Sequence, residues 1–303
     1  MLGSSNPVFN NMNEQVQRGG IGTAQRGGGQ GGFGQQGQQG GYQGFAQGQQ
    51  FAQQAAFRQG YEQTDYQQQA PAGERPMTID DVVTKSAMTL GIIVALGAVA
   101  FFLSQNNPGL ALPFLLVGGI GGFITVLVAT FGKKMGSAPV TLIYAAFEGL
   151  FVGAFSLVIP SAYGVAGASI PTLVFQAIIA SIAVFAGMLF VYKTGAIRVT
   201  PRFTRFMTAA IIGVALMALI NFVAAMFFDF NPLRDGGPIA IIFSLVCIGL
   251  AAFSFLMDFD NADKLVRAGA PAKMAWGVAL GLAVTIVWLY TEILRLLAIF
   301  NND

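Results

Sequence analysis

Ionisable side chains within or beside strongly apolar stretches are the part of this sequence that could do chemistry. They are Glu148, Asp258, Asp260, Asp263, Glu292 and Arg295. A charged group at membrane depth is costly unless it is paired or hydrated, so each of these residues is a candidate for function. Carboxylates in such places bind protons, or hard cations such as calcium, whose ligands are oxygen atoms.

Glu148 is the most unusual of these residues. It stands ten residues into the apolar run 138–159. At the rise of an α-helix its carboxyl group would lie about 15 Å deep, near the middle of a bilayer. We interpret Glu148 as a proton-sensitive ion contact. The alternative is a protonated glutamic acid that only hydrogen-bonds a neighbouring helix.

Asp258 directly follows the apolar run 238–257, at the end of the sixth span, and opens a carboxylate cluster, residues 258–263. An oxygen-rich cluster at the mouth of a span suits calcium, and Asp258 is the candidate metal ligand because it is nearest the bilayer. The spacing is not that of an EF-hand, because Gly269 stands where such a loop needs its bidentate Glu. The alternative is a hydrated helix end.

Glu292 and Arg295 stand three residues apart in the last apolar run, so one helix face can carry both. Glu292 would lie about 26 Å from the start of that run, near the outer interface, where an arginine side chain can reach water. We interpret the pair as a structural brace.

The residue types that are scarce exclude several classes of chemistry. The chain has no histidine and a single cysteine, Cys247, within an apolar run. Without histidine the usual general base and the Ser/His and Cys/His catalytic arrangements are missing, so we predict that the protein is not an enzyme and holds no cofactor. A net charge of +2 gives no general attraction for nucleic acid.

The composition shows what must position these residues. Hydrophobic residues make up 54% of the 303 residues and charged residues 10%, with a mean hydropathy of +0.62, so most of the surface must face lipid. Seven apolar runs are long enough to cross a bilayer. They are 84–104, 109–131, 138–159, 170–192, 206–228, 238–257 and 275–299. Because the runs are continuous, we predict an all-α polytopic membrane protein with a bundle of seven transmembrane helices.

Residues 1–76 have a different composition, with 17 glycines and 19 glutamines and no periodic Leu, Ile or Val. Such a segment cannot bury enough apolar surface to fold, which predicts a disordered tail followed by a membrane domain, 77–303. Thr78 followed by Asp81 is a helix-capping pattern, so the first helix is expected to begin there.

Basic residues are distributed unequally between the two sides of the predicted bundle. Ten Lys and Arg residues fall on the side of the N-terminus, whereas Arg234 and Arg295 fall on the other. The positive-inside rule then predicts a cytoplasmic N-terminus and an outer C-terminus in a cell membrane.

Three motifs stand in the third, sixth and seventh spans: YAAFEGLFVG at 144–153, MDFDN at 257–261 and LYTEILRLL at 289–297. In this order they resemble the Bax inhibitor-1 family over residues 77–303. The long low-complexity tail is similar to those of a bacterial branch of that family.

The resemblance implies six helices that surround a seventh, in a protein that works as a pH-sensitive calcium leak. In that family two aspartates, one at the end of the sixth span and one early in the seventh, share protons and gate the pore. Asp258 matches the first aspartate, but the second position falls on Thr285, which cannot ionise. Thr285 and Glu148 would lie at a similar depth, about 15 Å, so we hypothesise that Glu148 replaces the missing carboxylate and titrates together with Asp258.

We therefore expect a pH-sensitive cation channel or transporter that carries calcium, with Asp258 and Glu148 as ion contacts and proton sensors. The alternative is a membrane interaction protein without transport, which modulates a membrane protease or a stress response. The carboxyl group inside the third span favours the first function, and the long tail 1–76 favours the second.

Overall fold

The computed structural model describes residues 75–301, apart from 168 and 229. These residues form seven long helices. They are α3 (Ile79–Asn106), α4 (Ala111–Phe131), α5 (Ala138–Ala162), α6 (Ser169–Thr194), α7 (Pro201–Phe228), α8 (Pro238–Arg267) and α9 (Ala275–Phe300). Short 3-10 turns, η1 (Pro108–Leu110) and η2 (Ala272–Met274), precede α4 and α9.

All seven helices are long and apolar enough to cross a membrane, which confirms the predicted all-α, multi-pass architecture. Each predicted span falls within one of them, except that residues 109 and 110 of the second span lie in η1, directly before α4. Helix α8 continues ten residues past the predicted end of the sixth span, residue 257, to Arg267. Hydropathy marks where a helix leaves lipid and not where it ends, so the polar last turns of α8 were not recognised as helix.

Helix α3 begins where the capping pattern predicts. The Thr78 hydroxyl accepts a hydrogen bond from the backbone N–H of Asp81 at 3.2 Å, and the Asp81 carboxylate accepts one from the N–H of Thr78 at 3.0 Å. The predicted disorder of residues 1–76 concerns, except for Arg75 and Pro76, residues outside the described part of the chain.

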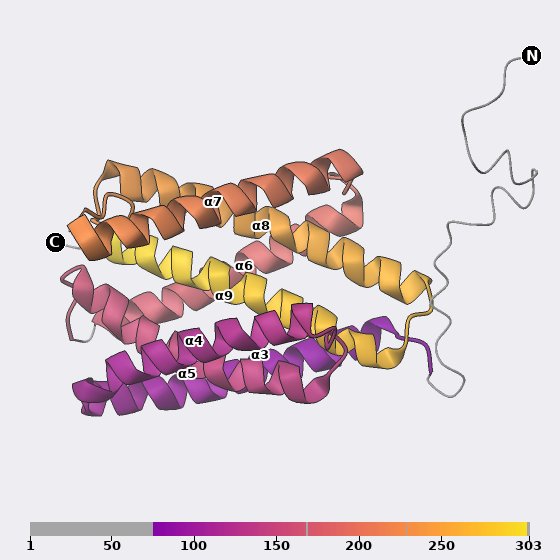
Figure 1. Ribbon diagram of the computed structural model, residues 1–303, viewed down its shortest axis with the longest axis horizontal. Helices are drawn as coiled ribbons and strands as arrows, with labels where there is room; N and C mark the ends of the chain where they lie inside the picture. Colours follow the sequence, from indigo (N-terminus) through magenta and orange to yellow (C-terminus); the bar gives the residue numbers. More distant parts are fainter. Residues whose placement is uncertain (1–74, 168, 229, 302–303) are drawn as a thin grey trace, which may run out of the picture. The chain divides into compact units, whose positions relative to one another are not determined.

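Helix α9 occupies the central position among the helices. Figure 1 shows it running between the α3–α4–α5 group and the α7–α8 pair, and its main contacts are with α3, α5, α6 and α8. Small side chains line its first half, where Ala275, Ala279 and Ala283 are fully buried. They allow the neighbouring helices to approach closely.

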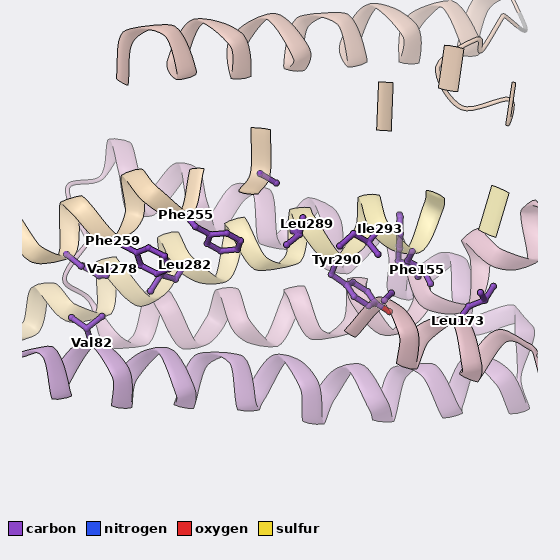
Figure 2. Packing of buried hydrophobic residues seen from close by; sticks show 14 of the residues in the cluster. Val82, Phe155, Leu173, Phe255, Phe259, Val278, Leu282, Leu289, Tyr290 and Ile293 are labelled. Atoms are coloured by element: carbon purple, nitrogen blue, oxygen red, sulfur yellow. The ribbon is translucent and has the colours of Figure 1, made fainter. Parts of the chain in front are cut away.

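The main hydrophobic cluster lies along α9 (Figure 2). Leu282, Leu289 and Ile293 of α9 pack in it with Phe255 and Phe259 of α8. The core therefore holds α8 and α9 against each other as an antiparallel helical pair, which positions the residues discussed below.

Helices α4 and α7 lie farther out than the family resemblance implies. Helix α4 packs mainly on α5, and α7 packs mainly on α8, so four rather than six helices make the main contacts with α9. Glycines bring the helices of the first group close together, because a Cβ atom at Gly153 of α5 would collide with the backbone of α3 at Gly97.

Candidate functional site

Asp258 lies in the interior of α8, nine residues before the helix ends at Arg267. The interpretation of Asp258 as a hydrated helix end is therefore wrong. The next two carboxylates of the predicted cluster pair with basic residues along the last turns of α8, Asp260 with Lys264 at 2.5 Å and Asp263 with Arg267 at 2.8 Å. These pairs support the helix, and they leave Asp258 as the member of the cluster that faces the bundle.

Asp258 faces Thr285 of α9. The Thr285 hydroxyl donates a hydrogen bond to Oδ2 of Asp258 at 2.7 Å, and Thr285 itself is buried. Thr285 stands ten residues after the start of α9, which places the pair about 15 Å along that helix. The two positions that the family resemblance singles out are therefore in direct contact near the middle of the bundle.

The Thr285 hydroxyl has a second acceptor within reach, the backbone carbonyl of Gly281 at 3.2 Å. A hydroxyl group has one hydrogen, so it can donate to only one of the two oxygens at a time. When Asp258 is ionised the hydrogen goes to its carboxylate. When Asp258 is protonated, the carboxyl group can itself donate to Thr285, and the hydroxyl hydrogen can turn to Gly281.

Aromatic side chains flank Asp258 on α8. Phe255 and Phe259 are buried, and the ring of Phe185 from α6 packs edge-on against both, with centroid separations of 5.3 and 5.5 Å. Figure 2 shows Phe255 and Phe259 side by side where α8 packs on α9. The carboxyl group therefore stands next to apolar surface that keeps bulk water away from this side of it.

Glu148 lies against a different helix. Its Oε2 atom is so close to α4 that a Cβ atom at Gly122 would lie 2.8 Å from it, and its side chain interacts with that of Tyr144, one turn earlier on α5. Asp258 is instead paired with α9. A similar depth does not bring these two carboxyl groups into contact, because α5 turns Glu148 towards α4.

Glu292 and Arg295 form an ion pair inside the bundle. Arg295 also donates to Ser244 of α8, from Nε at 3.2 Å and from Nη2 at 3.1 Å. Only 3% of Arg295 is exposed, so the predicted extension of its side chain to outer water is wrong. The pair nevertheless braces the structure, because it joins α9 to α8 two to three turns beyond Thr285.

No group of three or more Asp, Glu, Cys or His side chains that could hold a metal ion occurs in the part of the chain that the structure describes. Asp258 offers one carboxylate, with the hydroxyl of Thr285 beside it. Such a set can contact a passing cation, but it lacks the six to eight oxygen ligands of a tight calcium site.

Comparison with known families assigns the chain. A family model described as "Bax inhibitor 1 like" matches residues 6–302. The chain belongs to the Bax inhibitor 1 like family. The match begins at residue 6, inside the predicted tail, whereas the motifs had indicated the family for residues 77–303 only. No curated protein matches the chain significantly.

Within this Bax inhibitor 1 like chain, the residues that hold the polar groups together were only partly predicted. Ser244, and the pair of Ser156 with Tyr290 at 2.6 Å, had not been singled out. Serine in an apolar helix often bonds only to its own backbone, as Ser181 does to the carbonyl of Ala177. Residue type alone therefore does not show which serine reaches another helix.

Proposed function

We propose that this membrane protein of the Bax inhibitor 1 like family is a pH-sensitive cation leak channel or transporter. The observation that carries the proposal is the contact between Asp258 and Thr285, which places a carboxyl group beside a hydroxyl group near the middle of the bundle. Ionisable groups at such depth are costly and are typical of ion and proton pathways.

The proposed pH dependence follows from the charge of Asp258. An ionised carboxylate attracts a cation, whereas a protonated one does not, so flux is expected to rise as the pH rises through the range in which Asp258 loses its proton. The shared hydrogen of Thr285 supports this switch, because either protonation state of Asp258 keeps a hydrogen-bond partner.

We propose calcium as the transported ion, as the family resemblance implies. A leak needs contacts that are strong enough to admit an ion and weak enough to release it. One carboxylate and one hydroxyl fit this requirement better than a closed cage of carboxylates would. Glu148 is proposed as a second proton-sensitive contact, and Glu292 with Arg295 as the brace on the outer side.

We further propose that the protein lies in a bacterial cell membrane with its N-terminus in the cytoplasm. The distribution of basic residues, ten on the N-terminal side of the bundle against two on the other, supports the orientation. The similarity of the tail, residues 1–76, to those of a bacterial branch of the family supports the bacterial membrane.

The test of this function is reconstitution of the purified full-length protein in liposomes that contain a calcium-sensitive dye. Calcium flux above that of empty liposomes, with a dependence on pH between acid and neutral conditions, is the expected result. An absence of flux at every pH would overturn the channel reading. It would leave the alternative, an interaction protein that modulates a membrane protease or a stress response.

A further inference from the structure

The segment that precedes α3 lies across the loop between α8 and α9. The backbone N–H of Met77 donates to the carbonyl of Ala270 at 2.7 Å, and the N–H of Ala272 donates to the carbonyl of Arg75 at 3.0 Å. Pro76 and Pro271 face each other between these two bonds as an antiparallel bridge. A strand-like contact therefore joins two segments that lie nearly 200 residues apart in the sequence.

Prolines suit both central positions of this bridge. In an antiparallel pair whose flanking residues make the hydrogen bonds, the two directly opposed residues use neither of their N–H groups for pairing. Proline has no N–H to lose there, and its fixed φ angle keeps both segments extended. The sequence is thus consistent with a stable contact at Pro76 and Pro271.

Side chains strengthen the contact on both sides. Met77 is buried in the main hydrophobic cluster, and the Nη1 and Nη2 atoms of Arg75 donate to the Asp81 carboxylate, at 2.8 and 2.6 Å. Lys85 of α3 donates to the carbonyl of Ala272 at 2.5 Å, and its Nζ atom lies 5.6 Å from the centre of the Trp276 ring. We call residues 75–78, with the loop 268–274 that they hold, the clamp.

The clamp holds the connection between the two helices of the candidate site. Asp258 stands nine residues before the end of α8, and Thr285 stands ten residues after the start of α9, so the clamped loop joins the helices that carry both partners. A displacement of this loop must move one helix relative to the other, because both helices are packed and stiff.

We propose that the clamp controls the contact between Asp258 and Thr285. With the clamp formed, α8 and α9 are held in the register in which the two side chains pair, and flux is low. Opening of the clamp frees the loop and raises flux. This inference rests on the proposed function, of which it is the regulation.

A disulfide across the bridge tests the proposal in the full-length chain. Directly opposed residues of such a pair have Cα atoms about 4.5 Å apart, within the range that a disulfide spans. Cys247 is the single cysteine, so the substitutions Cys247→Ser, Pro76→Cys and Pro271→Cys leave one possible pair. We expect the disulfide to form under mild oxidation, and failure to form it would overturn the proposed geometry.

Flux is then compared between the oxidised and the reduced protein in dye-loaded liposomes. Oxidation is expected to lower calcium flux by about fivefold or more, within the usual range of coupling between sites, and reduction is expected to restore it. The control carries Cys247→Ser and Pro76→Cys alone, and its flux should not respond to oxidation. Equal flux in the oxidised and reduced double-cysteine protein would overturn the coupling.

Hydrogen exchange separates the failure of this inference from the failure of the proposed function. Locking the clamp is expected to slow amide exchange at residues 258–267 and 275–285, whether or not the protein conducts calcium. Protection confined to residues 75–78 and 268–274 would overturn the coupling, even in a protein that conducts. Protection that reaches Thr285 without any flux would support the coupling and reject the leak function.

Discussion

At the scale of single residues, the protein pairs a carboxyl group with a hydroxyl group where the family resemblance implies two aspartates. Thr285 cannot carry charge, but it gives Asp258 a hydrogen-bond partner in both protonation states. The pair therefore keeps the proton dependence of one carboxyl group and avoids the repulsion that two ionised carboxylates would suffer.

The hydroxyl of Thr285 can be removed with little change in shape. Thr285→Val leaves the carboxyl group of Asp258 without this partner inside the bundle, which is expected to lower the free energy of unfolding by about 1–3 kcal/mol. Thr285→Ser, which keeps the hydroxyl, is the matched control and should retain most of the stability. Thermal unfolding in detergent measures both, and equal melting temperatures for the two variants would contradict the role given to the hydroxyl.

Glu148 and Asp258 are expected to act independently, because they lie against different helices. The effect of each substitution, Glu148→Gln and Asp258→Asn, can be expressed as a free energy, RT times the logarithm of the ratio of calcium fluxes. These two free energies should then add in the double variant, to within about 0.5 kcal/mol. Each single substitution should alter the pH profile. An interaction well above that limit would instead support the coupled pair that we hypothesised from their similar depth.

At the scale of helices, close backbone contact organises the α3–α4–α5 group. Gly97 of α3 and Gly153 of α5 meet where a side chain has no room, and Gly118 of α4 meets the backbone of α5 in the same way. Small-residue patterns in the sequence indicated close packing of this kind. They did not indicate which helix each glycine contacts, because every such face in lipid has several possible neighbours.

A single methyl group should disturb this packing. Gly153→Ala places a Cβ atom against the carbonyl oxygen of Gly97, and the forced shift is expected to cost about 1–3 kcal/mol. Gly213→Ala on α7 is the control, since its Cβ atom would meet nothing within 4 Å, and alanine favours a helix by up to about 1 kcal/mol. Melting temperatures should fall for the first variant only; a similar change in both would contradict the assigned contact.

At the scale of the whole molecule, the sequence was sufficient to predict the seven spans and their order, because long apolar runs allow few alternatives in a bilayer. It was not sufficient for the contacts between spans. Asp258 was placed at a helix end because the apolar run stops there. Helix α8 in fact extends to Arg267, and two ion pairs between residues four apart stabilise its last turns. Arg295 was placed at the interface by its depth, although Ser244 and Glu292 hold it inside.

The predicted orientation can be tested on intact cells. In a Cys247→Ser background, Asn301→Cys at the end of α9 should react with a membrane-impermeant maleimide added outside. Ala196→Cys, in the exposed loop between α6 and α7, should react only after lysis, because that loop lies on the basic side. The reverse pattern would contradict a cytoplasmic N-terminus.

The central claim is that Asp258 is the proton-dependent cation contact of the pathway. The most direct test compares the pH profile of calcium flux for the unsubstituted protein, Asp258→Asn and Asp260→Asn in dye-loaded liposomes. Flux should rise with pH for the unsubstituted protein and for Asp260→Asn, whose carboxylate pairs with Lys264 of the same helix. For Asp258→Asn we predict a flux lower by about tenfold, equivalent to about 1.4 kcal/mol, with a weaker dependence on pH, because only Glu148 then remains as a proton-sensitive contact. An unchanged profile for Asp258→Asn would contradict the account.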